Sequence, residues 1–182
     1  LSGSAELYEA LFQRVGIISV TNPSQVLETL KFLCVVGTPK GKHVVGFTCS
    51  GGGATMLADY AEKIDLIFPE FKSTQETELS ALLPDIATVS NPLDYTTPIW
   101  GHAEMTYPVF AKAISAIEAD TAVLVQDYPA AEIDSSKVYY RNDAMAFARA
   151  SKERGLPAII CATLPENMDL ETRQLLITKG VA

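Results

Sequence analysis

The chain has 182 residues, of which 48% are hydrophobic and 20% are charged, and its formal net charge is −8. This is an ordinary globular composition, and the length suggests one domain or one domain with an appendage. The acidic balance argues against nucleic acid and anionic membranes as partners, because both are bound by basic patches. An anionic ligand would therefore need a local device, such as the positive end of a helix.

The cysteines and the apolar runs bear on disulfides, metal sites, the cellular compartment and membrane spans. Cys34, Cys49 and Cys161 stand singly, without a Cys-x-x-Cys pair or a Cys/His cluster, so the sequence predicts neither a disulfide framework nor a metal site. This usage fits the reducing cytoplasm. We expect no membrane span and no signal peptide. Because residue 1 is Leu and lies in a helical pattern, we expect the chain to be a fragment of a longer polypeptide.

The first forty residues predict two helices. Residues 4–15 (SAELYEALFQRV) place Leu7, Leu11 and Val15 on one face, and Gly16 ends this helical period. The next residues, 16–20 (GIISV), predict a short strand.

A second helix is predicted from Pro23, because Asn22 suits an N-cap and Pro suits the first helical position. The turn residues 37–42 (GTPKGK) then mark the main boundary. We therefore predict that residues 1–40 form an N-terminal helical appendage and that residues 41–182 form the main domain.

From residue 43 onward, strand-like and helical segments alternate. The predicted strands cover residues 43–49, 64–68, 86–90, 121–126 and 155–162, and the predicted helices cover residues 52–63, 74–83, 106–118, 135–153 and 169–179. Ser73 with Glu76 suggests a capping box at the second of these helices. The alternation predicts an α/β fold with a doubly wound parallel sheet, which binds ligands in loops after the carboxyl ends of its strands.

The first such loop, residues 48–54 (TCSGGGA), leads from a strand into a helix. Glycines at a helix N-terminus admit a close oxygen atom, and the free N–H groups and the helix dipole favour its negative charge. Ser50, Gly51, Gly52 and Gly53 are therefore candidate phosphate-binding residues. A tight turn between strand and helix explains the same glycines, and the spacing alone leaves both interpretations open.

The later loops carry weaker candidates. Asn91 and Asp94, in SNPLDYTTPIWGH, could support a phosphate loop, although an Asx turn that satisfies its own backbone explains them as well. Tyr95 and Trp100 add aromatic surface beside them. Gln126 and Asp127 end a buried strand, where ligand contacts arise.

A capped turn through Asp134 or Ser135 is the alternative explanation for that third loop. His43 suits an exposed strand start, and His102 lies in a loop at the ligand edge. Cys49 precedes a helix N-terminus, a position that lowers the pKa of a thiol.

Four stretches together resemble the NDP-forming acyl-CoA synthetases, relatives of succinyl-CoA synthetase. They are LSGSAELYEALFQRVGIISV, TCSGGGATMLAD, SALLPDIATVSNPLDYTT and TAVLVQDYP, in family order and spread over the chain. The first is similar to the segment that follows the family's phosphohistidine loop. The second is similar to its Gly-rich loop and helix, although Cys49 stands where the family usually has Asn and Ala54 where many members have Gly.

This resemblance implies a flavodoxin-like ligase domain over residues 41–182, preceded by the tail of another ligase domain over residues 1–40. The family interconverts a carboxylic acid, CoA and ATP with acyl-CoA, ADP and phosphate, through an acyl phosphate and a phosphohistidine. It implies that Ser50–Gly53 offer backbone donors to the phosphoryl group, with loop support from Asn91 and Asp94.

The resemblance also implies what this chain lacks. The phosphohistidine is expected just before Leu1, so the fragment alone should be inactive, and neither His43 nor His102 matches its motif. CoA and ATP or ADP with Mg would be bound in the full enzyme, by CoA-binding and ATP-grasp domains on the same chain or another subunit, and a homo-oligomer is possible. Two alternatives stay open: a flavodoxin-like module that binds a phosphorylated cofactor, with Tyr95 or Trp100 stacked on its ring, and a non-catalytic docking domain.

Overall fold

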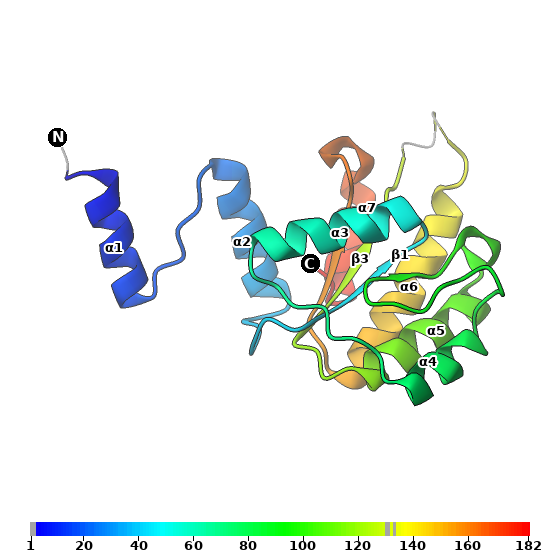
Figure 1. Cartoon of the computed structure of the whole chain (residues 1–182). Coiled ribbons are helices and arrows are strands. Elements are labelled where there is room, and N and C mark those ends of the chain that lie inside the picture. Colours follow the sequence, from blue (N-terminus) through cyan, green and yellow to red (C-terminus); the bar gives the residue numbers. More distant parts are fainter. Residues whose placement is uncertain (1–2, 130–131, 133) are drawn as a thin grey trace.

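Four parallel strands, in the order β2-β1-β3-β4, form the sheet of the computed structural model, which describes residues 3–129, 132 and 134–182 (Figure 1). The strands are β1 (Val44–Thr48), β2 (Leu93–Asp94), β3 (Thr121–Val125) and β4 (Ala158–Cys161). In the register, Val44 of β1 pairs with Thr121, and Ala122 of β3 pairs with Ala158. The strand order and the helices on both faces confirm the predicted flavodoxin-like, doubly wound α/β fold.

Seven helices surround or precede this sheet in the part of the chain that the structure describes. They are α1 (Ala5–Val15), α2 (Pro23–Val35), α3 (Gly51–Lys63), α4 (Ser73–Ser80), α5 (Ala103–Ala116), α6 (Lys137–Arg154) and α7 (Leu170–Thr178), and Thr97–Ile99 and Pro165–Asn167 form short 3-10 turns. α3 packs on β1, whereas α5 and α6 lie side by side on the other face. None of the described helices combines the length and the hydrophobicity that a membrane crossing needs.

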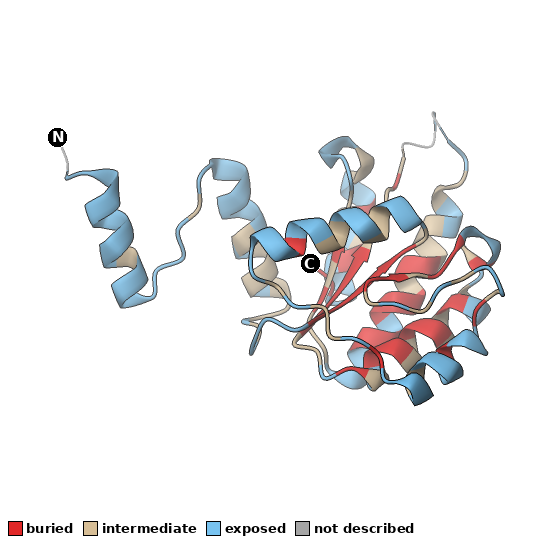
Figure 2. Ribbon diagram, viewed as in Figure 1, coloured by how far each residue is buried: buried red, intermediate tan, exposed pale blue. Residues whose placement is uncertain are grey.

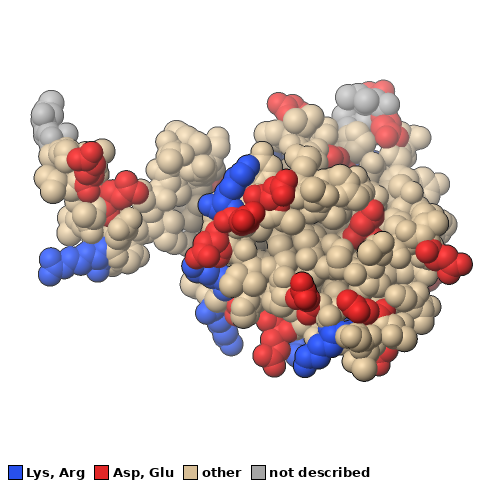
Figure 3. Space-filling model, in the orientation of Figure 1, with Lys and Arg blue, Asp and Glu red and all other residues tan. Residues whose placement is uncertain are grey.

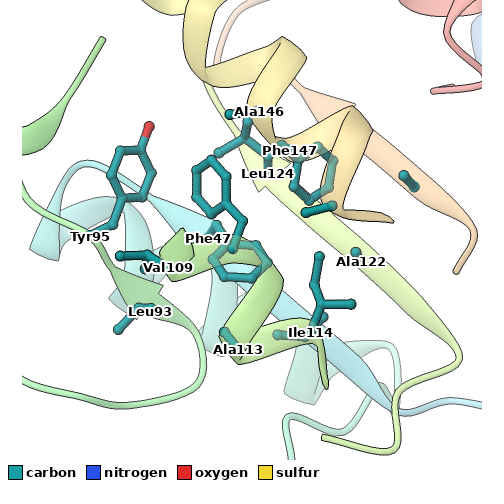
Figure 4. Packing of buried hydrophobic residues seen from close by; sticks show 14 of the residues in the cluster. Phe47, Leu93, Tyr95, Val109, Ala113, Ile114, Ala122, Leu124, Ala146 and Phe147 are labelled. Carbon is teal, nitrogen blue, oxygen red and sulfur yellow. The ribbon is translucent and has the colours of Figure 1, made fainter. Parts of the chain in front are cut away.

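The hydrophobic core lies between the sheet and the α5–α6 layer (Figure 2). The ring of Phe47 from β1 packs edge-on against Phe110 of α5, with ring centroids 4.9 Å apart, and against Phe147 of α6, at 5.9 Å. Figure 4 shows Phe47 and Phe147 within this cluster. The helical spacing in the predicted helix 106–118 places five apolar residues on one face, and all are 0–5% exposed: Val109, Phe110, Ala113, Ile114 and Ile117. Such helical periods mark the face that a helix buries.

The N-terminal helices are both capped, at Asn22 as predicted, but bury little. Ser4 caps α1 and Asn22 caps α2, with side-chain oxygens that accept backbone N–H groups. Neither helix contains a buried residue, and α1 projects away from the sheet (Figure 2). The predicted strand at 16–20 is wrong: Ile17 and Ile18 are exposed, and no neighbouring strand pairs with them. A strand needs such a partner for its backbone groups.

The predicted strands at 64–68 and 86–90 are also not formed as strands. Ile67 makes a single parallel bridge with His43. Beyond it, the side chain of Asn91 makes the hydrogen bonds to β1 that a longer strand would make. The Gly46 N–H donates to Asn91 Oδ1 at 2.9 Å, while Asn91 Nδ2 donates to the carbonyls of Val44 at 2.9 Å and Pro69 at 3.0 Å. Because one amide side chain satisfies these backbone groups, β2 needs only two residues.

Two predicted helix starts are shifted. The capping contact of α4 joins the Lys72 N–H to Gln75 Oε1 at 2.7 Å, one residue before the predicted Ser73 and Glu76 pair. α5 begins at Ala103, three residues before its predicted start.

Candidate functional site

The start of α3 leaves backbone donors open at the carboxyl end of β1. Ser50 is the N-cap, and its Oγ accepts the Gly53 N–H at 3.4 Å. The N–H groups of Gly51 and Gly52 meet no acceptor among the described residues, and Ser50, Gly51 and Gly52 are exposed. Residues 50–53 are called the glycine mouth below. Such free N–H groups carry the positive end of the helix dipole.

The turn from β1 to α3 is tight, since only Cys49 and Ser50 separate the two elements, and helix–sheet packing accounts for one of its glycines. None of its three glycines has a positive φ. A Cβ on Gly53 would lie 2.7 Å from Thr48 Oγ1, so Gly53 must be small for the helix to approach the strand. A Cβ on Gly52 would meet only Ser50 Oγ, at 3.8 Å. Neither a turn nor packing therefore requires glycine at position 52, where it costs helix stability.

Asp94 lies beside the glycine mouth, as the sequence predicts. A Cβ on Gly51 would be 3.5 Å from Asp94 Oδ2, while Asp94 Oδ1 accepts the Thr96 N–H at 2.9 Å. The Asx turn is therefore formed, and its carboxylate also faces the mouth. Asn91 is farther back, where it supports β1 rather than the loop itself.

The aromatic residues of the second loop do not form a ring-binding surface. Tyr95 is 0% exposed, so its predicted stacking on a cofactor ring is wrong. Trp100 is half-buried, and its ring packs against Tyr139 at 5.5 Å and Tyr140 at 4.7 Å. These contacts remove the support for a cofactor-binding module.

Sequence reasoning missed a buried carboxylate beneath this loop. Asp143 of α6 is 0% exposed and accepts hydrogen bonds from Tyr95 Oη at 2.9 Å, the Gly101 N–H at 3.0 Å and Thr106 Oγ1 at 3.1 Å. Burial raises the pKa of Asp143 to about 6, although these donors oppose the rise. A signal existed, because Asp143 directly precedes Ala144 on the apolar face of the predicted helix.

Cys49 and the histidines supply no reactive group at the mouth. Burial, with a further contribution from the charge of Asp143, raises the pKa of the Cys49 thiol, so the predicted lowering is wrong. His43 lies before β1, at the opposite end of that strand. His102 precedes α5, where its side chain is 54% exposed and its Nδ1 is 3.6 Å from Glu104 Oε1.

The residues of the third loop connect turns to one another. Asp127 accepts the Thr163 N–H at 2.9 Å and an Asn167 Nδ2–H at 3.1 Å, which ties the end of β3 to the end of β4. Gln126 is buried and accepts from Tyr128 Oη at 2.8 Å. The predicted turn through Asp134 is present, because Asp134 accepts the Ser136 N–H at 2.8 Å.

The basic side chains at the start of α6 are held in ion pairs. Lys137 and Arg141, at the start of α6, are paired with Asp169 and Glu171 of α7. Acidic side chains are spread over the face in Figure 3, in keeping with the net charge of −8. Among the described residues, no three His, Cys, Asp or Glu side chains are grouped as metal ligands. The donors that the glycine mouth presents are thus the Gly51 and Gly52 N–H groups and the Ser50 hydroxyl, with Asp94 as a nearby negative charge.

Comparisons with known proteins agree with the predicted resemblance. No protein-family model matches the chain. Over 94 residues, or 52% of the chain, it is 31% identical to the alpha subunit of ADP-forming acetate–CoA ligase II from Pyrococcus furiosus, and the match covers 20% of that subunit. It is 27% identical over 94 residues to the ADP-forming acetate–CoA ligase of Methanocaldococcus jannaschii, covering 13% of it. The chain thus matches only a small part of these relatives.

Solved structures share the fold over nearly the whole chain. PH0766 from Pyrococcus horikoshii OT3 has a TM-score of 0.78 and 22% identity, covering 99% of this chain and 40% of its own. The dinucleotide-forming acetyl-coenzyme A synthetase 1 of Candidatus Korarchaeum cryptofilum, in complex with phosphate and ADP, has a TM-score of 0.73 and 19% identity, covering 100% and 38%. The chain is thus similar in sequence to ADP-forming acetate–CoA ligases, over a small part of their length, and shares its fold with an acetyl-coenzyme A synthetase.

Proposed function

We propose that this chain is part of an NDP-forming acyl-CoA synthetase and that its glycine mouth stabilises a phosphoryl group during transfer. The observation that carries the proposal is the pair of exposed N–H groups of Gly51 and Gly52, which have no acceptor among the described residues. Glycine at position 52 has no packing role, and it leaves the helix backbone open to a ligand oxygen. The relatives' names, which state ADP-forming CoA ligation, support the reaction class.

The proposed reaction interconverts a carboxylic acid, CoA and ATP with acyl-CoA, ADP and phosphate. In the direction of ATP formation, phosphate oxygen attacks the thioester carbonyl and releases the CoA thiolate, which gives an acyl phosphate. A histidine nitrogen then attacks phosphorus and releases the carboxylate, and ADP finally accepts the phosphoryl group. The glycine mouth adds donors to the phosphoryl oxygens, where charge is concentrated in such transfers.

This chain supplies positioning and electrostatics rather than the nucleophile. His43 precedes β1, at the end of the strand opposite the mouth, and neither it nor His102 matches the family's phosphohistidine motif, so we assign the phosphohistidine to another part of the enzyme. We likewise assign CoA, ATP or ADP and Mg to CoA-binding and ATP-grasp domains. The chain's exposed apolar stripe on α3 supports contact with such domains: Met56, Tyr60 and Ile64 are 55–67% exposed.

The domain division follows the same proposal. We propose that residues 1–40 are the tail of a preceding ligase domain and that residues 41–182 form the ligase domain with the glycine mouth. Two facts support this: α1 buries none of its residues on this chain, and Gly37 connects α2 to β1 through a left-handed conformation at φ 82°.

The test is Gly52→Asp, with Gly52→Ala as its matched control. Position 52 has room for a Cβ, and an acidic side chain in the first turn of a helix favours the fold. We expect Gly52→Asp to keep the unfolding midpoint of this chain, but to lose phosphate-induced NMR shifts at Gly51 and to abolish turnover in the intact enzyme. Gly52→Ala should retain both properties. Full turnover in Gly52→Asp would contradict the proposal.

A further inference from the structure

The loop that carries Asp94 is fastened from below by α6. Asp143 accepts the Gly101 N–H, and the preceding residue, Asn142, donates from Nδ2 to the Gly101 carbonyl at 3.1 Å. Both polar groups of one peptide residue are thereby held by one helix turn. A Cβ on Gly101 would lie 2.6 Å from Tyr139, so the loop also lies directly on the helix surface.

The same carboxylate reaches the start of the loop. Tyr95 immediately follows Asp94, its N–H donates to the Thr48 carbonyl at 2.9 Å, and its hydroxyl donates to Asp143 at 2.9 Å. The Tyr95 hydroxyl also lies 3.4 Å from Gln126 Nε2, at the end of β3. Asp94 is therefore attached to a rigid buried network on one side and faces the glycine mouth on the other.

A buried carboxylate at this position destabilises the folded state. None of the ion pairs among the described residues includes Asp143, and burial without a cation disfavours the charged form. An apolar core residue would avoid this cost, but it would not hold Tyr95, Gly101 and Thr106 together. Fully satisfied buried networks of this kind rigidify what they connect.

We propose that Asp143 is a positioning residue that fixes Asp94 beside the glycine mouth, where the Asp94 carboxylate limits how tightly the mouth holds phosphate. This inference rests on the proposed phosphate-binding function. A mouth that bound free phosphate tightly would gain no rate, because only interactions that strengthen in the transition state accelerate transfer. An opposing carboxylate at a fixed distance weakens ground-state binding while leaving the N–H donors in place.

The closing experiment measures binding of inorganic phosphate to the 182-residue chain by amide NMR shifts of Gly51 and Gly52. Asp94→Asn should tighten binding severalfold, and Asp143→Asn should also tighten it, because the loop is released. The double variant should bind no more tightly than Asp94→Asn alone, since both changes act through one carboxylate. Tyr95→Phe, which removes one donor and keeps the carboxylate, should give a smaller change in the same direction and serves if Asp143→Asn does not fold.

The matched control is Asp127→Asn, another carboxylate at this edge of the sheet, which binds Thr163 and Asn167 rather than the Asp94 loop. Its phosphate affinity should equal that of the wild type. A residue with only a structural role would lower stability without raising phosphate affinity. Unchanged or weaker binding in both Asp143→Asn and Tyr95→Phe would therefore overturn the inference, as would equal tightening in Asp127→Asn.

A pH titration tests the hydrogen bonds between Asp143 and the Asp94 loop in the absence of phosphate. Tyr95, Tyr128, Cys49 and His102 are the titratable groups that face Asp143. The Gly101 amide shift should show one inflection near pH 6, absent in Asp143→Asn and retained in His102→Gln, because histidines titrate in a similar range. If no variant responds to phosphate, the proposed function fails for this chain. If the inflection is missing, the positioning role of Asp143 is refuted, whatever the result of the phosphate titrations.

Discussion

Two helices that begin at the same edge of the sheet treat their free N–H groups in opposite ways. α7 is capped by Asp169, whose carboxylate accepts from the Thr172 N–H at 3.1 Å and Thr172 Oγ1 at 2.7 Å and pairs with Lys137 at 2.7 Å. α3 is capped by the neutral Ser50 through one long hydrogen bond, and glycines follow. One helix has its own anion in place, and at the other the Gly51 and Gly52 N–H groups have no acceptor among the described residues.

Asp169 shows what an anion gains at such a helix terminus. Burial alone would raise its pKa, but hydrogen bonds from Lys137 and Thr172 lower it to about 2. The difference between the two helices therefore teaches that one cap residue decides whether the first N–H groups of a helix are satisfied within the chain or left without an internal acceptor.

The largest expected effect comes from adding a methyl group at the close contact between α3 and β1. Gly53→Ala places a methyl group 2.7 Å from Thr48 Oγ1, so we expect a loss of about 1–3 kcal/mol in unfolding free energy. Chemical denaturation measures it. Gly52→Ala is the control and should be neutral or stabilising by up to about 1 kcal/mol, because its Cβ has room. Equal losses would mean that glycine at position 53 has no packing role.

Removing the anion from α7 should cost somewhat less. Asp169→Ala is expected to lose about 1–2 kcal/mol at neutral pH, because a cap and a partner of Lys137 disappear. The folded-state pKa is depressed, so this stabilisation is present above the unfolded value of 3.8 and is lost as the pH falls towards 2. Denaturation of both proteins across that range should show the difference shrinking in acid. A constant difference would contradict the role of the charge.

The smallest expected effect concerns the opposing charge at the open helix start. Asp94→Asn keeps an oxygen for the Thr96 N–H but removes the charge beside Gly51. Two exposed unit charges a few ångströms apart interact by about 1 kcal/mol, so phosphate affinity should rise about fivefold. Isothermal titration with phosphate measures it, and the salt dependence should weaken the difference. Weaker binding would mean that Asp94 assists the anion.

The sequence predicted those parts of the fold that depend on local chemistry. The apolar period of α5, the Asn22 cap and the position of the glycine mouth follow from neighbouring residues. The predicted strands at 16–20, 64–68 and 86–90 failed, because apolar β-branched runs do not reveal whether a partner strand exists.

The candidate site shows the same limit. Its glycines could be located from the sequence, but the close approach of Thr48 to Gly53 and the normal φ angles could not. Asp143 lies within the helix predicted over residues 135–153, yet its partners Tyr95 and Thr106 precede it by 48 and 37 residues. A single sequence does not show such distant pairing.

The side chain of Asn91 has a consequence beyond the support of β1. Edge strands with open hydrogen-bonding groups are templates on which a foreign strand can add. Here the side chain of Asn91, rather than a strand, hydrogen-bonds the Gly46 N–H and the Val44 carbonyl, next to a strand of only two residues. This edge thus leaves few unpaired backbone groups with which a strand of a neighbouring molecule could pair, which protects the fold from sheet extension and aggregation.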